Sequence, residues 1–165
     1  MAGQNLQSLN DLFTNELKDI LNAEKQITQA LPKMIDAASS PQLKAKFEAH
    51  LKQTNDQIQR LNEVFSMLGL QPSEEHCEGM AGIIRDGEKI VSAQGDPAVK
   101  DAGIIAAAQK VEHYEISSYG TLRTFAQTLG RNDIAEKLQV TLKQEAATDE
   151  ILTQVAERSV NKKAA

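Results

Sequence analysis

Six side chains of the types that bind metal ions occur at spacings that would bring them together between helices. They are five carboxylates and one imidazole: Glu24, His50, Glu112, Glu115, Glu145 and Asp149. Carboxylate oxygens combined with an imidazole nitrogen suit iron or manganese. No cysteine lies near these positions, which argues against a zinc-thiolate site. We therefore expect a carboxylate-rich site for two metal ions.

The grouping depends on an internal repeat with an offset of 91 residues. Laying Glu24 on Glu115 places Thr54 on Glu145 without a gap. Apolar positions repeat with the same offset: Leu43 with Ile134, Phe47 with Leu138, and Leu51 with Leu142. Two similar helical hairpins, each with a carboxylate on its first helix, are how metal sites between four helices are built.

Helical spacing and the expected running directions set the heights of the six side chains. Residues three, four or seven apart share a helix face. The sequence predicts two layers about one helical turn, or roughly 5 Å, apart: Glu24, Glu115 and Glu145 in one, and His50, Glu112 and Asp149 in the other. Carboxylates this close in a dry core would mostly be protonated, and a pair of divalent or trivalent metal ions removes that conflict.

Each of these residues also has a purely structural interpretation. A glutamate or aspartate on a helix is most often a solvated surface residue, and Asp149 could be only that. His50 alone could make a polar contact in the core. Thr54 stands where a symmetrical site would carry a carboxylate, so the predicted site is asymmetric. Tyr119 shares the face of Glu115 and is expected either to hydrogen-bond a ligand or to pack in the core.

Helices are the elements predicted to position these residues. The chain has four Phe, two Tyr and no Trp, and its abundance of Ala, Leu, Gln, Glu and Lys favours helix over strand. Apolar periodicity predicts long helices over 8–38, 41–69 and 97–130, and a last one from 132 or 133 to a fraying tail. Ser8, Ser40 and Asp96 are the predicted N-caps of the first three, and Asn132 or Asp133 of the last.

Residues 70–96 form a connection of roughly 27 residues that is rich in glycine and contains one short helix. A single long connection between two hairpins is typical of an all-α four-helix bundle with one crossover. In that topology the first and fourth long helices run one way, and the second and third run the other. The whole chain, 1–165, is expected to form one domain with its core over about 8–158.

Charge and cysteine content limit the partners and the compartment. The net charge of −5 and the lack of a basic block, apart from a short C-terminal tail, argue against nucleic acid. No run approaches the 18 apolar residues that a membrane helix needs. Cys77 has no second cysteine to pair with, and no apolar signal core follows Met1, so we expect a cytoplasmic protein.

Several short motifs are similar to those of one bacterial family. They are AEKQ at 23–26, ALPK at 30–33, EAHL at 48–51 with Thr54, AAAQKVEHYEI at 106–116 and SYGTL at 118–122. Over about 11–156 the chain resembles the YciE/YciF family of bacterial stress-related proteins, and the YciF branch more closely. The resemblance implies a ferritin-like fold similar to that of rubrerythrins, a homodimer and a dinuclear metal site.

The chain departs from the wider ferritin-like pattern, in which the second and fourth helices carry Glu-x-x-His. The matching positions here are Thr54 with Gln57, and Glu145 with Thr148. We expect His50 and Glu112 to replace the missing ligands one turn away. Ferroxidase or peroxidase chemistry therefore cannot be transferred directly from the superfamily.

Three functional hypotheses follow. The first is a dinuclear iron or manganese protein that handles iron, dioxygen or peroxide under stress and, if it is an enzyme, is an oxidoreductase. The alternative is a metal-free helical dimer, a binding or scaffold protein whose buried carboxylates share protons. An iron-storing cage is the third, and the assembly state would decide it. The single cysteine excludes electron transfer through a rubredoxin-like module.

Overall fold

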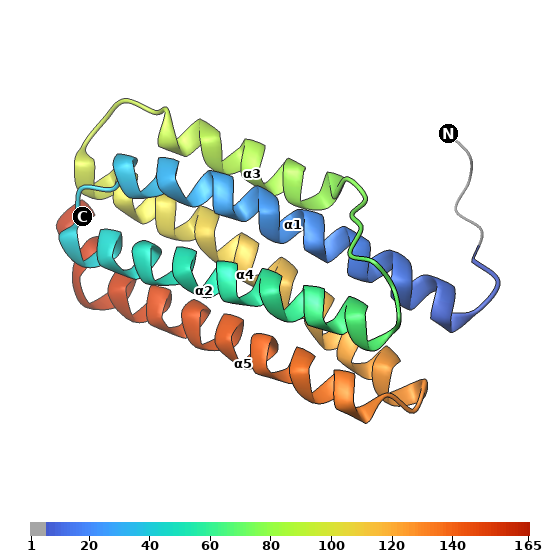
Figure 1. Ribbon diagram of the computed structural model, residues 1–165. Helices are drawn as coiled ribbons and strands as arrows, with labels where there is room; N and C mark the ends of the chain where they lie inside the picture. The colour runs from blue at the N-terminus through green and yellow to red at the C-terminus, as the bar shows by residue number, and fades with distance from the viewer. Residues whose placement is uncertain (1–5) are drawn as a thin grey trace.

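The computed structural model describes residues 6–165, which form a bundle of four long helices with a shorter helix along one side (Figure 1). The long helices are α1 (Leu9–Ala37), α2 (Pro41–Met67), α4 (Pro97–Thr128) and α5 (Asn132–Val155). The crossover contains α3 (Glu78–Val91), which packs on α1 and α4. No strand occurs within this range. The predicted all-α bundle with one long crossover is confirmed.

Helix directions follow the predicted crossover topology. In Figure 1, α1 and α5 run in one direction and α2 and α4 in the other, while α3 carries the chain back from the end of α2 to the start of α4. Among residues 6–165, every helix is too short or too polar to traverse a lipid bilayer.

Side-chain caps begin the first three long helices as predicted. The Ser8 hydroxyl accepts a hydrogen bond from the Asp11 amide at 3.1 Å, and the Ser40 hydroxyl accepts one from the Leu43 amide at 3.4 Å. The Asp96 carboxylate accepts from two amides of α4, at 2.8 and 3.1 Å. Each cap satisfies amides that the first helical turn leaves unpaired.

The start of α5 differs from the prediction. The helix begins at Asn132, and Arg131 occupies the cap position without a side-chain cap, so Asn132 or Asp133 as the cap was wrong. Gly130 has φ +74°, and the Arg131 amide donates to the Ala126 carbonyl of α4 at 2.8 Å. The tight turn at Gly130 places Arg131 in the cap position, and its guanidinium pairs with Asp133 at 2.8 Å.

The repeat predicted from the sequence is reproduced in the core. Leu43 and Ile134 are both fully buried, and Phe47 and Leu138 are only 2% and 1% exposed. The C-terminal segment is more ordered than the predicted fraying tail, because α5 continues through the π-helix η1 (Ala156–Val160) into α6 (Asn161–Ala164). Val160 is buried there, and both segments pack on α4.

Asp101 forms a contact that the sequence did not indicate. This carboxylate is buried in the second turn of α4 and accepts hydrogen bonds from the Ser39 amide, the Ser39 hydroxyl and the Ser40 amide, at 2.7, 2.6 and 2.8 Å. It therefore ties the α1–α2 turn to the start of the second hairpin. A negative charge at the beginning of α2 also complements the helix dipole.

Candidate metal centre

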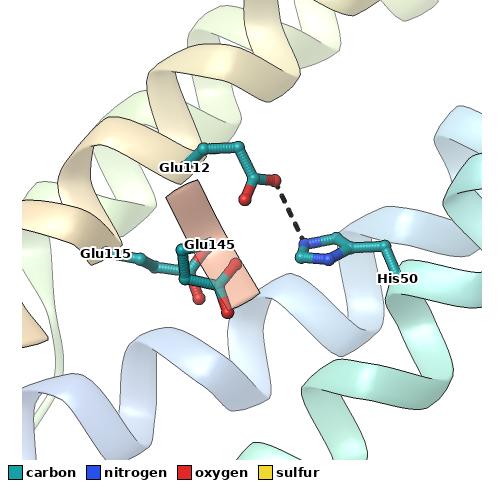
Figure 2. Close-up of side chains that lie close together, drawn as sticks. All are labelled: His50, Glu112, Glu115 and Glu145. Atoms are coloured by element: carbon teal, nitrogen blue, oxygen red, sulfur yellow. Dashed lines mark ion pairs between the residues drawn. The ribbon is translucent and has the colours of Figure 1, made fainter. Parts of the chain in front are cut away.

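Four buried side chains from three helices converge in the middle of the bundle (Figure 2). They are His50 of α2, Glu112 and Glu115 of α4, and Glu145 of α5. One potential ligand atom from each lies within 4.8 Å of the other three. All four belong to the set predicted from the sequence, and the internal repeat brings them to neighbouring heights.

His50 and Glu112 face each other across the bundle. The His50 Nε2 atom lies 3.2 Å from Glu112 Oε1, the contact that the dashed line in Figure 2 marks. Both side chains are almost completely shielded from solvent, with 4% and 1% exposure. Thr54 is also buried one turn further along α2, and its hydroxyl donates to the His50 carbonyl at 3.0 Å.

Glu24 of α1 lies beside this cluster and is fully buried. Its carboxyl group interacts with those of Glu115 and Glu145. The Tyr119 hydroxyl donates a hydrogen bond to Glu24 Oε1, whereas Glu24 Oε2 has no hydrogen-bond partner. Tyr119 is itself fully buried, so it both hydrogen-bonds a predicted ligand and packs in the core.

Gln57 of α2 hydrogen-bonds Glu145 of α5. Its Nε2 atom donates to Glu145 Oε1, and the side chain is fully buried on α2. Sequence reasoning identified Gln57 only as the residue that stands where related bundles carry a histidine. A polar residue on the apolar face of α2, one turn from Thr54, was the signal for this contact.

Asp149, unlike Glu24, points away from the cluster and pairs with other side chains. Its carboxylate accepts a hydrogen bond from Gln109 Nε2 at 3.0 Å and pairs with His113 Nε2 at 3.2 Å. His113 is 68% exposed, so this contact faces the outside of the bundle. These contacts with Gln109 and His113 hold the Asp149 carboxylate away from the cluster.

Burial dominates the electrostatics of the four carboxyl groups. It raises the pKa of Glu24 and of Glu112 to about 8, and the pKa of Glu145 to about 9. Burial also raises the pKa of Glu115 far above its ordinary value, and the charges of Glu24 and Glu145 add to the rise. Without a cation, these groups therefore retain protons at neutral pH.

Several polar atoms of the cluster lack hydrogen-bond partners in the described structure. They are Glu24 Oε2, His50 Nδ1, Glu112 Oε2, both carboxyl oxygens of Glu115, and Glu145 Oε2. Buried polar atoms are nearly always paired. Without a cation these carboxyl oxygens can pair only with each other, Glu24 with Glu115 and Glu112 with Glu145, by keeping protons. A cation satisfies several oxygens at once and balances their charge. The residues present therefore fit a site for a metal ion with oxygen and nitrogen ligands.

Cys77 takes no part in this cluster. Its thiol lies 3.0 Å from the Tyr114 hydroxyl, which donates to Asp19 of α1 at 2.9 Å. Cys77 also caps α3, where it accepts from the Met80 amide at 3.3 Å. The candidate site consequently contains no thiolate.

Fold and site together define an all-α bundle protein with a buried carboxylate–histidine cluster between its long helices. Residues 8–165 match the family described as "Domain of unknown function (DUF892)", and the chain belongs to this family. It is 44% identical to Protein YciF of Escherichia coli over 161 residues, which cover 97% of each chain. The predicted resemblance to the YciF branch is confirmed.

Solved structures show the same architecture. The E. coli stress protein YciF superimposes with a TM-score of 0.91 and 42% identity, over 95% of this chain and 99% of that one. YcfI of Rhodopseudomonas palustris also gives 0.91 and 42%, over 94% and 99%. A protein from Xanthomonas campestris shares the fold with a TM-score of 0.73 at 21% identity, over 93% and 94% of the two chains.

Proposed function

We propose that this protein binds two iron or manganese ions in the buried cluster and handles iron, dioxygen or peroxide during stress. Glu24, His50, Glu112, Glu115 and Glu145 would hold the metal ions. The observation that carries the proposal is the set of unpaired carboxyl oxygens in the dry centre of the bundle. Carboxylates with one imidazole suit these two metals.

Bound iron or manganese would supply electron transfer to dioxygen or peroxide, so any turnover makes the protein an oxidoreductase. The chain itself contributes a site that excludes water and holds the ligands in place. Tyr119 fixes the orientation of Glu24, and Gln57 fixes that of Glu145. The description of the E. coli relative as a stress protein supports a role in stress.

Elemental analysis of protein purified without chelators tests the proposal, followed by anaerobic equilibrium dialysis of metal-free protein against Fe(II) and Mn(II). We expect close to two metal ions per chain. A variant with Glu115→Gln and Glu145→Gln should bind neither metal tightly, and its helical circular dichroism should match that of wild type. Wild-type protein that binds no iron or manganese would overturn the proposal.

A metal-free binding or scaffold protein is the second candidate. It is favoured by the raised pKa values of the buried carboxyl groups, which let these groups stay protonated and neutral without a metal ion. In that case Glu115→Gln stabilises the fold under all conditions, and added metal ions have no effect on unfolding. Equal thermal stability with and without Mn(II) would support this candidate over the first.

We also propose a homodimer located in the cytoplasm. Large apolar side chains remain exposed on α4 and α5, including Val99 at 53%, Val140 at 46% and Ile151 at 37%. Such side chains suit an interface with a second copy. Light scattering coupled to size-exclusion chromatography should give twice the mass of the 18.0 kDa chain. A much larger particle would instead support the iron-storing cage.

A further inference from the structure

An apolar cavity leads from the surface to one end of the candidate metal centre. It has a volume of about 40 Å³ and lies among α1, α2, α3 and α4. Its inner end is formed by the buried His50 and Glu112. Its outer end is formed by Lys33 and Glu88, which are exposed and form an ion pair of 2.7 Å between α1 and α3.

The walls between these two ends are almost entirely hydrocarbon. They include Ile27, Leu31, Ile83, Val91, Ala107 and Ala108. Cavities with such walls stay dry and take up small apolar atoms or molecules. A single water molecule needs about 10–15 Å³ of cavity volume, so this cavity has room for a molecule of two or three atoms.

The two ends of the cluster differ in what can reach them. His50 and Glu112 line the cavity, whereas Glu24, Glu115 and Glu145 do not. A metal ion or a charged oxygen species would lose its hydration shell between apolar walls without gaining new partners. Hydrogen peroxide would lose the hydrogen bonds of both its hydroxyl groups. Dioxygen has neither charge nor hydrogen bonds to lose.

We propose that this cavity is a binding site and access route for dioxygen to the His50–Glu112 end of the cluster. The role of the route rests on the proposed metal-binding function, but occupation of the cavity by an apolar gas does not. The crossover helix α3 supplies one wall of the cavity. The route therefore depends on the segment that distinguishes this bundle from a simple up-and-down arrangement.

Two glycines of α3 provide matched variants. A Cβ atom added at Gly87, which lines the cavity, would lie 3.4 Å from the Ala107 Cβ. That is an ordinary contact, so Gly87→Ala narrows the cavity without a severe clash. A Cβ atom added at Gly82 would meet only the end of the Arg85 side chain, at 3.8 Å, and Gly82 does not line the cavity. Both substitutions raise the helix propensity of α3 equally.

Xenon-pressurised crystals of wild type, Gly82→Ala and Gly87→Ala test the proposal directly. We expect a xenon atom in the cavity of wild type and of Gly82→Ala, and roughly half that occupancy or less in Gly87→Ala, because the added methyl group fills part of the space. No xenon in the wild-type cavity, or equal occupancy in all three proteins, would overturn the proposal.

Dioxygen itself is tested by methyl NMR relaxation of wild type under oxygen pressure. The methyl group of Ala108, which lines the cavity and is 4% exposed, should relax faster than that of Ala38, which is 3% exposed and lies outside the cavity. Equal relaxation of the two methyl groups would contradict the assignment. Equilibrium dialysis with Mn(II) separates the two proposals. Gly87→Ala should bind Mn(II) as tightly as wild type does. If wild type binds no Mn(II), the proposed metal site is wrong, but the proposed occupation of the cavity by an apolar gas is not.

Discussion

The two helical hairpins share one architecture but contribute different side chains to the buried cluster. The α1–α2 hairpin contributes Glu24 and His50. The α4–α5 hairpin contributes Glu112, Glu115 and Glu145. Three of the four central carboxyl groups thus come from the second hairpin, and the only imidazole comes from the first.

Two equivalent positions of the repeat, Thr54 and Glu145, account for part of this difference in side chains. Thr54 and Glu145 are both fully buried at matching places, but the Thr54 hydroxyl bonds to its own helix, whereas Glu145 faces the cluster. Gln57 then reaches across from α2 to hold Glu145. Both positions are therefore filled by a buried side chain, whether or not that side chain faces the cluster. We expect the second hairpin to dominate metal affinity and the first to tune it.

Removing a carboxylate from the second hairpin should have the largest effect. Glu115→Gln removes the negative charge and replaces one of the two unpaired carboxyl oxygens with an amide nitrogen that cannot bind a metal ion. It should lower Mn(II) affinity by more than about 100-fold, because even indirect partners of metal ligands contribute 10- to 100-fold. Isothermal titration calorimetry measures this change. Glu150→Gln, at an exposed position of α5, is the control and should leave the affinity unchanged. An unchanged Mn(II) affinity in Glu115→Gln would contradict the expectation that the second hairpin dominates metal affinity.

The pH dependence of stability should reverse when metal is present. Folded-state pKa values of about 8 for Glu24 and Glu112 and about 9 for Glu145 exceed the ordinary value of 4.5. The folded metal-free protein then binds more protons than the unfolded chain. The stability that these groups contribute is fully present below pH 4.5 and is lost as the pH rises to about 8–9.

Urea unfolding at pH 5, 7 and 9 measures this dependence, with chelator or with Mn(II). Bound metal requires ionised carboxylates, so the stabilisation by Mn(II) should grow with pH. Glu145→Gln should flatten the curve obtained in chelator. A metal-free protein that becomes more stable between pH 5 and 9 would show that these carboxyl groups are ionised in the fold without a cation.

Making the hairpins alike should destabilise the metal-free fold. Thr54→Glu adds a carboxylate at the position that matches Glu145, and we expect a loss of about 1–3 kcal/mol in chelator from overpacking and uncompensated charge. Mn(II) should recover part of this loss if the new carboxylate reaches the cluster. Thr54→Gln controls for size. If Mn(II) stabilises Thr54→Glu and Thr54→Gln equally, the added carboxylate does not bind the metal, and position 54 is not equivalent to Glu145 as a ligand.

The contribution of the first hairpin can be tested at Tyr119. Tyr119→Phe removes the hydrogen bond to Glu24 and should weaken metal binding by about tenfold, without loss of the fold. Tyr114→Phe is the matched control on the same helix, because the Tyr114 hydroxyl hydrogen-bonds Asp19 and Cys77 and not a residue of the cluster. Equal losses in both variants would indicate a general loosening of α4 rather than a role in orienting Glu24.

Asp149 should have the smallest effect. Its carboxylate already pairs with Gln109 and His113, so Asp149→Asn should change Mn(II) affinity by about twofold or less. Calorimetry under the conditions used for Glu115→Gln gives a direct comparison. A loss as large as that of Glu115→Gln would restore Asp149 to the ligand set predicted from the sequence.

Most of the fold could be predicted because its signals are local. Ser8, Ser40 and Asp96 start helices through contacts within one turn, and apolar periodicity defines the faces that pack. The cap at Asp101 could not be predicted, because its partners Ser39 and Ser40 lie about sixty residues away in the chain. Nothing in the local pattern distinguishes it from a solvated surface acid.

The candidate site was predictable to the extent that the repeat fixes heights along the bundle. Glu24 and Glu115 occupy equivalent positions, and His50 lies one turn from Thr54, so these side chains meet in the structure. Rotation about the helix axis is less well determined by spacing, and this is where Asp149 diverges. The apolar cavity was not foreseen, since its walls come from four helices that only the tertiary structure brings together.

The central claim is that the carboxylate–histidine cluster binds metal ions. Anomalous diffraction from crystals soaked in Mn(II) tests it most directly, with data collected on either side of the manganese absorption edge. We predict two peaks among Glu24, His50, Glu112, Glu115 and Glu145, with ligand distances of roughly 2.0–2.3 Å. Crystals with no manganese peak in the bundle, or with peaks only at surface groups such as His113 and Asp149, would contradict the account.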